Sequence, residues 1–291
     1  MTVAVGRKGV GKTIETIKFI YQYVSGTSKM KPRKALIFDV NNEFSSFDFP
    51  MPNGEMAKHK ISRLLIKDLP RFTASNVIEV RRIAPYWDNN TLMSRDEYSK
   101  ALEIIFTGYR DGLLLMEDIN LYTNESMKGD LLGRLVTLRH IGIDVVIHYQ
   151  GVGKVFTPTI LANTGFLRMH KTNDTVARHI NKDLSKRDIL CIAENIVNKR
   201  YYNGQKNGTN DKYFNLLIDI ENNKIYNSGN FRINQEEVED AIRNYISTYK
   251  SSILPPILNQ IDRNGNNIYT LKTGIAHLEQ SFFDDMFVFK R

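Results

Sequence analysis

The sequence contains little that would tie the protein to an oxidising compartment or to a bilayer. Its 291 residues include one cysteine, Cys191, so neither an internal disulfide nor a cysteine-based zinc site can form. Cys191 lies in an apolar run, which indicates a core position and fits a reducing compartment. No apolar stretch reaches the roughly 18 residues of a membrane-spanning helix. Lys8 and Lys12 interrupt the place where a signal peptide would be apolar.

Internal repeats and low-complexity tracts are also absent, and the overall composition is that of an ordinary globular protein. Hydrophobic residues make up 42% and charged residues 25%, enough for one large α/β domain with a small appendage. Lys and Arg number 40 against 32 Asp and Glu, a net charge of +8. This excess favours a polyanionic partner such as nucleic acid or an anionic membrane, although a merely basic enzyme would look the same.

The apolar pattern predicts strands that alternate with helices. Buried strands are expected at 2–5, 35–38, 113–116 and 145–147, with weaker candidates at 77–83 and 166–169. Helices are expected at 13–24, from Ser94 with a capping box, and at 131–138, whereas 45–60 carries Pro and Gly and is predicted to be loop. Further on we expect a helix at 184–197, a hairpin around 221–223 and a helix at 236–249. Such alternation implies βαβ units and a parallel sheet covered on both faces.

The strongest motif lies between the first strand and the first helix. It reads G-x-x-x-x-G-K-[ST], the pattern of a phosphate-binding loop. Its glycines let successive backbone N–H groups face the phosphates, and the following helix adds its positive N-terminal dipole. The lysine reaches the β- and γ-phosphates of ATP, and the threonine hydroxyl ligates Mg²⁺. The residues concerned are Gly6, Arg7, Lys8, Gly9, Val10, Gly11, Lys12 and Thr13.

Two further polar positions follow buried strands and complete a candidate hydrolytic site. Glu117 and Asp118 end the strand at 113–116, where such ATPases carry a Mg²⁺ contact and a group that activates water. By position, Glu117 takes the Mg²⁺ role and Asp118 the water-activating role. The order is reversed from the usual Asp then Glu, which leaves the assignment open between the two. Gln150 follows the next strand and could hydrogen-bond the γ-phosphate or the attacking water.

Taken together, these motifs resemble the FtsK–HerA superfamily of P-loop DNA-pumping ATPases over residues 1–174. The more specific matches are Asp39-x-x-x-Glu43-Phe44 after the second strand and Arg139-His140-Ile141-Gly142 before the strand that leads to Gln150. The resemblance implies a three-layer αβα P-loop NTPase with a mainly parallel sheet and a small C-terminal α+β extension. It also implies that the 113–116 and 145–147 strands are neighbours, with the latter beside the P-loop strand.

The same resemblance implies partners and a domain plan. It predicts a homo-oligomeric ring, expected as a hexamer, in which Arg139, or second Arg134, reaches the neighbouring subunit's γ-phosphate. DNA would be bound largely irrespective of sequence. Candidate basic stretches are 58–63, 67–71 and 182–187. We expect an ATPase core at 1–175, helices and a hairpin completing it at 176–252, and a tail at 253–291 that packs on the domain or on a neighbour.

Because the P-loop strand begins at residue 2, we expect a bare motor, most like the genome-packaging ATPases of tailless, membrane-containing viruses. Such a protein would act in the virion or the host cytoplasm and could dock on a capsid or membrane vertex protein. The Zot-like assembly ATPases of filamentous phages are the next relatives. Two other readings stay open: a small-molecule P-loop kinase with Asp39 as its Mg²⁺ acid, and a non-enzymatic module in which ATP only locks an oligomer.

Overall fold

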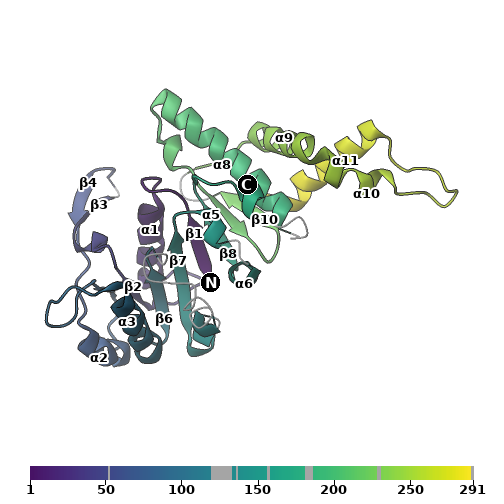
Figure 1. The fold of residues 1–291 in the computed structure, drawn as a ribbon. Coiled ribbons are helices and arrows are strands. Elements are labelled where there is room, and N and C mark those ends of the chain that lie inside the picture. The colour runs from purple at the N-terminus through teal and green to yellow at the C-terminus, as the bar shows by residue number, and fades with distance from the viewer. Residues whose placement is uncertain are drawn as a thin grey trace. The chain divides into compact units, whose positions relative to one another are not determined.

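The computed structural model describes residues 1–51, 53–118, 133–135, 137–155, 158–180, 186–227 and 231–289 (Figure 1). The chain forms two compact units. The first comprises Met1–Ala4, Gly11–Gln150 and Pro158–Asn163, and the second comprises Val5–Val10, Gly151–Thr157 and Thr164–Arg291. None of the helices within the described residues combines the length and apolar composition needed to cross a membrane.

The first unit is built on a parallel sheet whose strand order is β1-β7-β6-β2-β5. Its strands are β1 (Thr2–Val5), β2 (Lys34–Phe38), β5 (Val80–Ile83), β6 (Gly112–Met116) and β7 (Ile143–Tyr149). Neighbours from β5 to β7 pair in parallel. The predicted order is confirmed: β6 and β7 are neighbours, and β7 lies beside the P-loop strand. The carboxyl ends of β6 and β7 therefore meet at one edge.

Helices cover both faces of this sheet, as the near-continuous burial of β2 and β6 requires. Figure 1 shows α1 (Lys12–Ser25), α2 (Leu69–Ala74) and α3 (Arg95–Gly108) around the strands. One face packs on α1 in a buried cluster that includes Ile17, Ile20, Ala35, Ile37, Leu113, Leu115 and Val146. On the other face the ring of Phe38 meets Tyr98 of α3, with centroids 6.1 Å apart. Side chains alternate between the faces, so odd positions of β2 and β6 face α1.

A hairpin replaces the loop predicted at 45–60, and that prediction is wrong. It comprises β3 (Phe47–Pro50) and β4 (Met56–His59), which pair antiparallel. Pro50 is tolerated because it ends an edge strand, where its missing N–H breaks no ladder. The aromatic side chains of Phe49 and His59 lie edge to face at 5.5 Å and pack on Tyr21 of α1. Turn residues alone therefore did not decide the local structure.

Short segments complete the first unit. They are η1 (Glu43–Ser45), η2 (Ile66–Asp68), η4 (Arg139–Ile141) and α6 (Pro158–Ala162). Of the helix predicted at 131–138, residues 133–135, 137 and 138 are helical, and 131, 132 and 136 lie outside the described residues.

The second unit contains the strand order β8-β9-β10-β11. Its strands are β8 (Phe166–Met169), β9 (Leu216–Asp219), β10 (Lys224–Asn227) and β11 (Phe287–Val288). The β9–β10 hairpin confirms the one predicted around 221–223, and β11 joins β10 in parallel. The helices are α5 (Val152–Val155), α7 (Val176–His179), α8 (Arg187–Asn207), η5 (Asn210–Tyr213), α9 (Gln235–Ile253), α10 (Pro255–Leu258) and α11 (Leu271–Met286).

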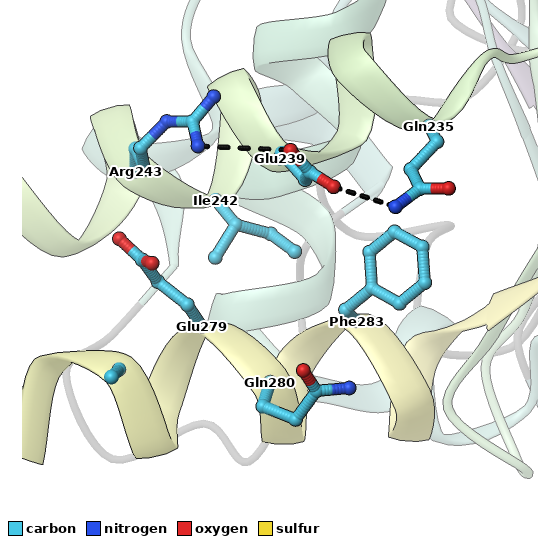
Figure 2. A pocket seen from close by; sticks show the side chains of 8 residues that line it. Gln235, Glu239, Ile242, Arg243, Glu279, Gln280 and Phe283 are labelled. Carbon is cyan, nitrogen blue, oxygen red and sulfur yellow. Dashed lines mark hydrogen bonds and ion pairs between the residues drawn. The ribbon is translucent and has the colours of Figure 1, made fainter. Parts of the chain in front are cut away.

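Helix α11 packs on α9, so the C-terminal segment folds back on its own unit. The two helices border a pocket of about 330 Å³ with Ile242 and Phe283 among its lining residues (Figure 2). On its rim Gln235 donates to Glu239 at 2.8 Å, and Arg243 lies 3.7 Å from the same carboxylate. Cys191 is buried in α8, as predicted. The predicted α/β class, a mainly parallel sheet with a C-terminal α+β extension, is confirmed.

Candidate nucleotide and magnesium site

The loop between β1 and α1 has the backbone that its glycines were expected to provide. Gly9 and Gly11 have φ angles of 81° and 85°, values that a residue with a Cβ rarely adopts. Gly11 is the N-cap of α1 and offers no side chain to that helix. The N-terminus of α1 thus receives no side-chain cap from Gly11, an arrangement suited to binding an anion there.

The first half of the loop is held by two residues that follow β8, which sequence reasoning missed. Arg7 donates its backbone N–H to the Lys171 carbonyl at 2.8 Å. His170 is buried and its Nδ1 lies 3.0 Å from the Val10 carbonyl. A Cβ on Gly6 would come within 2.6 Å of the His170 Cβ, so only glycine fits this approach. No sequence motif marks these contacts, because β8 is remote from the loop along the chain.

Glu117 lies against the first turn of α1, inside the first unit. Thr13 donates its hydroxyl to the Glu117 Oε1 at 3.4 Å, and the Glu117 residue is 3% exposed. Its Oε2 has no hydrogen-bond partner among the described residues. Burial raises the pKa of Glu117 to about 7, and the charge of Asp118 adds to this, whereas Thr13 and Lys12 act against it. The site thus contains a buried carboxylate oxygen without a partner.

This arrangement fits Mg²⁺. A hard cation prefers oxygen ligands, and Mg²⁺ commonly takes one or two from the protein and the rest from water and phosphate. The Thr13 oxygen keeps lone pairs while its proton points to Glu117, and the described residues offer no hydrogen-bond partner to the Glu117 Oε2. No cluster of three or more His, Cys, Asp and Glu side chains suited to a metal occurs in the described part of the chain. A site of Thr13 and Glu117 completed by phosphate and water needs no such cluster.

Asp118 faces different partners, although it is the next residue. Its Oδ2 accepts from the Gln150 side chain at 3.1 Å and from the Asn41 side chain at 2.8 Å. The φ angle of Asp118 is 42°, which takes it out of the β-strand alternation that places Glu117 on the α1 face. The structure therefore brings Asp118 and Gln150 together at the partly exposed sheet edge. The sequence analysis did not assign Asn41 to the site, although Asn41 lies within the Asp39–Glu43 motif named there.

Lys12 shares this edge with the acidic groups. Partial burial lowers the pKa of Lys12, and the charges of Asp118, Glu117 and Glu43 act in the opposite direction. The lysine thus lies within the electrostatic reach of three carboxylates. A cation set among acids at a loop of backbone amides is suited to hold a triphosphate beside a metal.

A buried histidine connects Glu117 with α1, and it was not anticipated. His148 is 1% exposed; its Nε2 lies 2.8 Å from the Thr16 Oγ1, and its Nδ1 lies 3.4 Å from the Glu117 Oε1. The strand register explains why Glu117 and His148 lie close together. Met116 of β6 pairs with Ile147 of β7, so the residue after each of them is brought alongside the other. The sequence did contain one indication of this position. His148 is two residues after the apolar Val146, so strand alternation places both side chains on the face that packs against α1.

The carboxylate oxygens of Asp39 are already occupied by hydrogen bonds to the following backbone and to an arginine. Its oxygens accept from the backbone N–H groups of Glu43 and Phe44 at 2.9 and 3.1 Å, and from Arg82 at 3.0 Å. Asp39 is fully buried, and burial raises its pKa to about 6, although Arg82 acts against this. A carboxylate so occupied has little capacity left for Mg²⁺, which disfavours the kinase role that the sequence left open for it.

The two candidate arginines lie away from this edge. Arg139 is exposed in η4, ahead of β7, whereas Gln150 follows the other end of that strand. At about 3.3 Å per residue, the 7 residues of β7 separate the two ends by about 20 Å, too far for Arg139 to reach its own subunit's site. Arg134 is exposed and lies 3.3 Å from Glu103. If Arg139 acts, it acts on another subunit.

Comparisons with known proteins give similarity in structure only. No protein-family model and no curated protein matches this chain. The genome packaging NTPase B204 from Sulfolobus turreted icosahedral virus 2, in complex with AMPPCP, is similar over 80% of this chain and 98% of its own, with 16% identity and a TM-score of 0.49.

Two further solved structures are similar at lower scores. B204 of Sulfolobus turreted icosahedral virus, described as its DNA-packaging ATPase, is 14% identical over 79% of this chain and 97% of its own, with a TM-score of 0.44. The N-terminal domain of zonular occludens toxin from Neisseria meningitidis is 13% identical over 59% of this chain and 76% of its own, with a TM-score of 0.32.

Proposed function

We propose that this protein is an ATP-hydrolysing motor that translocates DNA, with packaging of a viral genome into a preformed capsid as its task. The observation that carries the proposal is that the two adjacent acids, Glu117 and Asp118, face different partners. Glu117 accepts from Thr13 through Oε1 and keeps Oε2 without a hydrogen-bond partner among the described residues, and Asp118 faces Gln150 at the exposed edge. A metal-binding carboxylate, a water-orienting carboxylate and a neutral amide beside a phosphate loop are the parts of an ATP hydrolase.

Each residue then has a separate task. The amides of the loop at 6–13 and Lys12 bind the triphosphate, and Thr13 with Glu117 holds Mg²⁺. The bound metal would neutralise charge that develops on the phosphate oxygens. Asp118 and Gln150 orient the attacking water, and Asp118 accepts its proton. The contact between Gln150 and Asp118 would break or shift when a γ-phosphate arrives, which couples nucleotide state to the end of β7.

The ring and the DNA belong to the proposal as well. Arg139 is exposed and distant from its own Gln150, which suits a residue that completes a neighbour's site in a homo-oligomeric ring. Lys58, Lys60, Lys67 and Arg71 of the predicted basic stretches are exposed, whereas most of the 182–187 stretch lies outside the described residues. Exposed cations of this kind would contact the phosphate backbone and make binding salt-dependent.

ATP hydrolysis with and without double- and single-stranded DNA is the decisive experiment, with mass photometry on the same samples. We expect DNA-stimulated turnover by a ring, lost in Lys12→Ala and reduced at least 100-fold in Asp118→Asn (about 10² or more for removal of a catalytic base). Lys18→Ala is the matched control, because Lys18 lies on the same helix and its ion pair within the described residues is with Glu15, at 2.6 Å.

The alternatives predict different results. A DNA-indifferent monomer that phosphorylates a metabolite would replace the motor with the kinase reading. Turnover in a ring that DNA never stimulates, at any salt concentration, would favour a filamentous-phage-type assembly ATPase. If ATP turnover in the wild type is no higher than in Lys12→Ala, the result would support a non-enzymatic module in which ATP only locks the oligomer.

A further inference from the structure

The buried polar chain Thr13–Glu117–His148–Thr16 joins one oxygen of the metal-binding carboxylate to a single helix at two points. Thr13 and Thr16 stand three residues apart on α1 and so lie on the same side of that helix. Glu117 follows β6 and His148 is in β7, so three elements meet in this contact. Glu117, His148 and Thr16 are all buried, at 3%, 1% and 0% exposure. Little solvent is available there to replace a lost contact.

The imidazole lies against one oxygen of Glu117, and the other oxygen is buried without a hydrogen-bond partner among the described residues. Its Nδ1 lies 3.4 Å from Oε1, the same oxygen that accepts from Thr13, whereas Oε2 has no partner among the described residues. A neutral imidazole protonated at Nδ1 would direct that N–H toward Glu117 while Nε2 accepts from the Thr16 hydroxyl, 2.8 Å away; the Nδ1–Oε1 contact is longer than an aligned hydrogen bond and would shorten when the carboxylate is charged. Rotation of the carboxylate would break these contacts, so the geometry fixes which oxygen is presented.

We propose that His148 is a positioning residue that orients Glu117 toward Mg²⁺, with Thr16 bracing the imidazole from α1. This inference rests on the proposed nucleotide and magnesium site and assigns its second layer of residues. Groups that orient a metal ligand act on metal affinity without touching the metal, and their loss typically costs about 10- to 100-fold in affinity. The network also connects α1, the helix that follows the phosphate loop, with β7, the strand that precedes Gln150.

Two substitutions of His148 distinguish the contribution of the Nδ1 contact from that of the Nε2 contact. In His148→Asn the side-chain amide occupies the place of Nδ1 and can still donate to Glu117, but the contact with Thr16 is lost. In His148→Gln the amide reaches the place of Nε2 and can still meet Thr16, but the donor to Glu117 is lost. Both variants put a neutral amide in the same buried place, so they serve as controls for each other in folding and stability.

The readout is binding of a fluorescent, non-hydrolysable ATP analogue, measured in EDTA and over a Mg²⁺ titration, with thermal unfolding of each variant. We expect equal affinity in EDTA for all variants, a Mg²⁺ requirement raised about tenfold or more in His148→Gln, and a smaller increase in His148→Asn. Thr16→Val should fall between the wild type and His148→Gln.

The possible outcomes separate this inference from the function on which it rests. If the wild type binds the analogue more tightly with Mg²⁺ and His148→Gln does so at the same Mg²⁺ concentration, the positioning role is refuted. Equal losses in EDTA and in Mg²⁺ that follow the loss of thermal stability would also refute it, since they indicate a purely structural histidine. If the wild type shows no Mg²⁺-dependent binding, the proposed nucleotide site itself is wrong.

Discussion

The substitution Glu117→Gln tests whether the candidate metal ligand is held at the expense of stability. The pKa of the Glu117 carboxyl is raised by burial from 4.5 to about 7. Between these pH values the folded state keeps a proton that the unfolded state releases, so the free energy of unfolding falls as pH rises. At about 1.4 kcal/mol per pH unit, ionisation of this carboxyl costs the free protein about 3 kcal/mol by pH 8.

Glutamine keeps the shape of the side chain and cannot ionise. We therefore expect Glu117→Gln to be more stable than the wild type at pH 8, by up to about 3 kcal/mol, and nearly equal to it at pH 4.5. The measurement is urea unfolding from pH 4.5 to 8 in EDTA without nucleotide. Glu103→Gln is the control, because the Glu103 side chain is 61% exposed and should change stability by less than about 0.5 kcal/mol at any pH.

A difference between Glu117→Gln and the wild type that does not change with pH would refute this reasoning. It would mean that the carboxyl titrates alike in the folded and unfolded states and is not an uncompensated buried acid. The same variant should lose ATP hydrolysis, so stability and activity are expected to change in opposite directions.

Three other predictions follow from individual buried contacts. Arg82→Met removes the cation beside the buried Asp39 and should cost about 3–5 kcal/mol in urea unfolding, whereas Arg81→Met, at a half-exposed neighbour, should cost less than about 1 kcal/mol. Gly6→Ala places a Cβ 2.6 Å from a buried histidine Cβ and should cost about 1–3 kcal/mol in thermal unfolding and weaken nucleotide binding. Burial raises the pKa of Cys191 to about 12, so the folded protein should react with a thiol reagent only as fast as it unfolds.

Each of these has a clear contrary result. Equal losses in the two arginine variants would remove the special role of the buried ion pair. Unchanged nucleotide affinity in Gly6→Ala would show that the loop adjusts to the added methyl group. Rapid labelling of Cys191 at neutral pH, with the thiol accessible in the folded state, would contradict its burial.

Much of the fold could be predicted because its signals are local. The strands around 35–38, 113–116 and 145–147 are continuous apolar runs, and the capping box at Ser94 marks the start of α3. The hairpin at 47–59 was missed because its stability comes from aromatic contacts with Tyr21 of α1, which the local Pro and Gly content does not reveal.

Part of the candidate site was proposed from the sequence, and its roles remain predictions. The phosphate loop, both acids and Gln150 carry the chemistry in their own residue types and spacing. His148, Asn41 and the residues after β8 were not found, because each acts through a partner remote in sequence. A buried histidine in an apolar strand has many uses, and only its contacts with Thr16 and Glu117 identify this one.

The sequence by itself determined the phosphate loop, the α/β class and the set of acids at the ends of strands, because glycine spacing and apolar periodicity follow from local backbone geometry. Tertiary structure alone decided which partners the two adjacent acids face. Strand alternation turns Glu117 toward α1 and its threonines, and the positive φ of Asp118 turns the next carboxylate toward Gln150 and Asn41. That choice depends on which strands and helices meet at the sheet edge, and therefore on packing that no local pattern encodes.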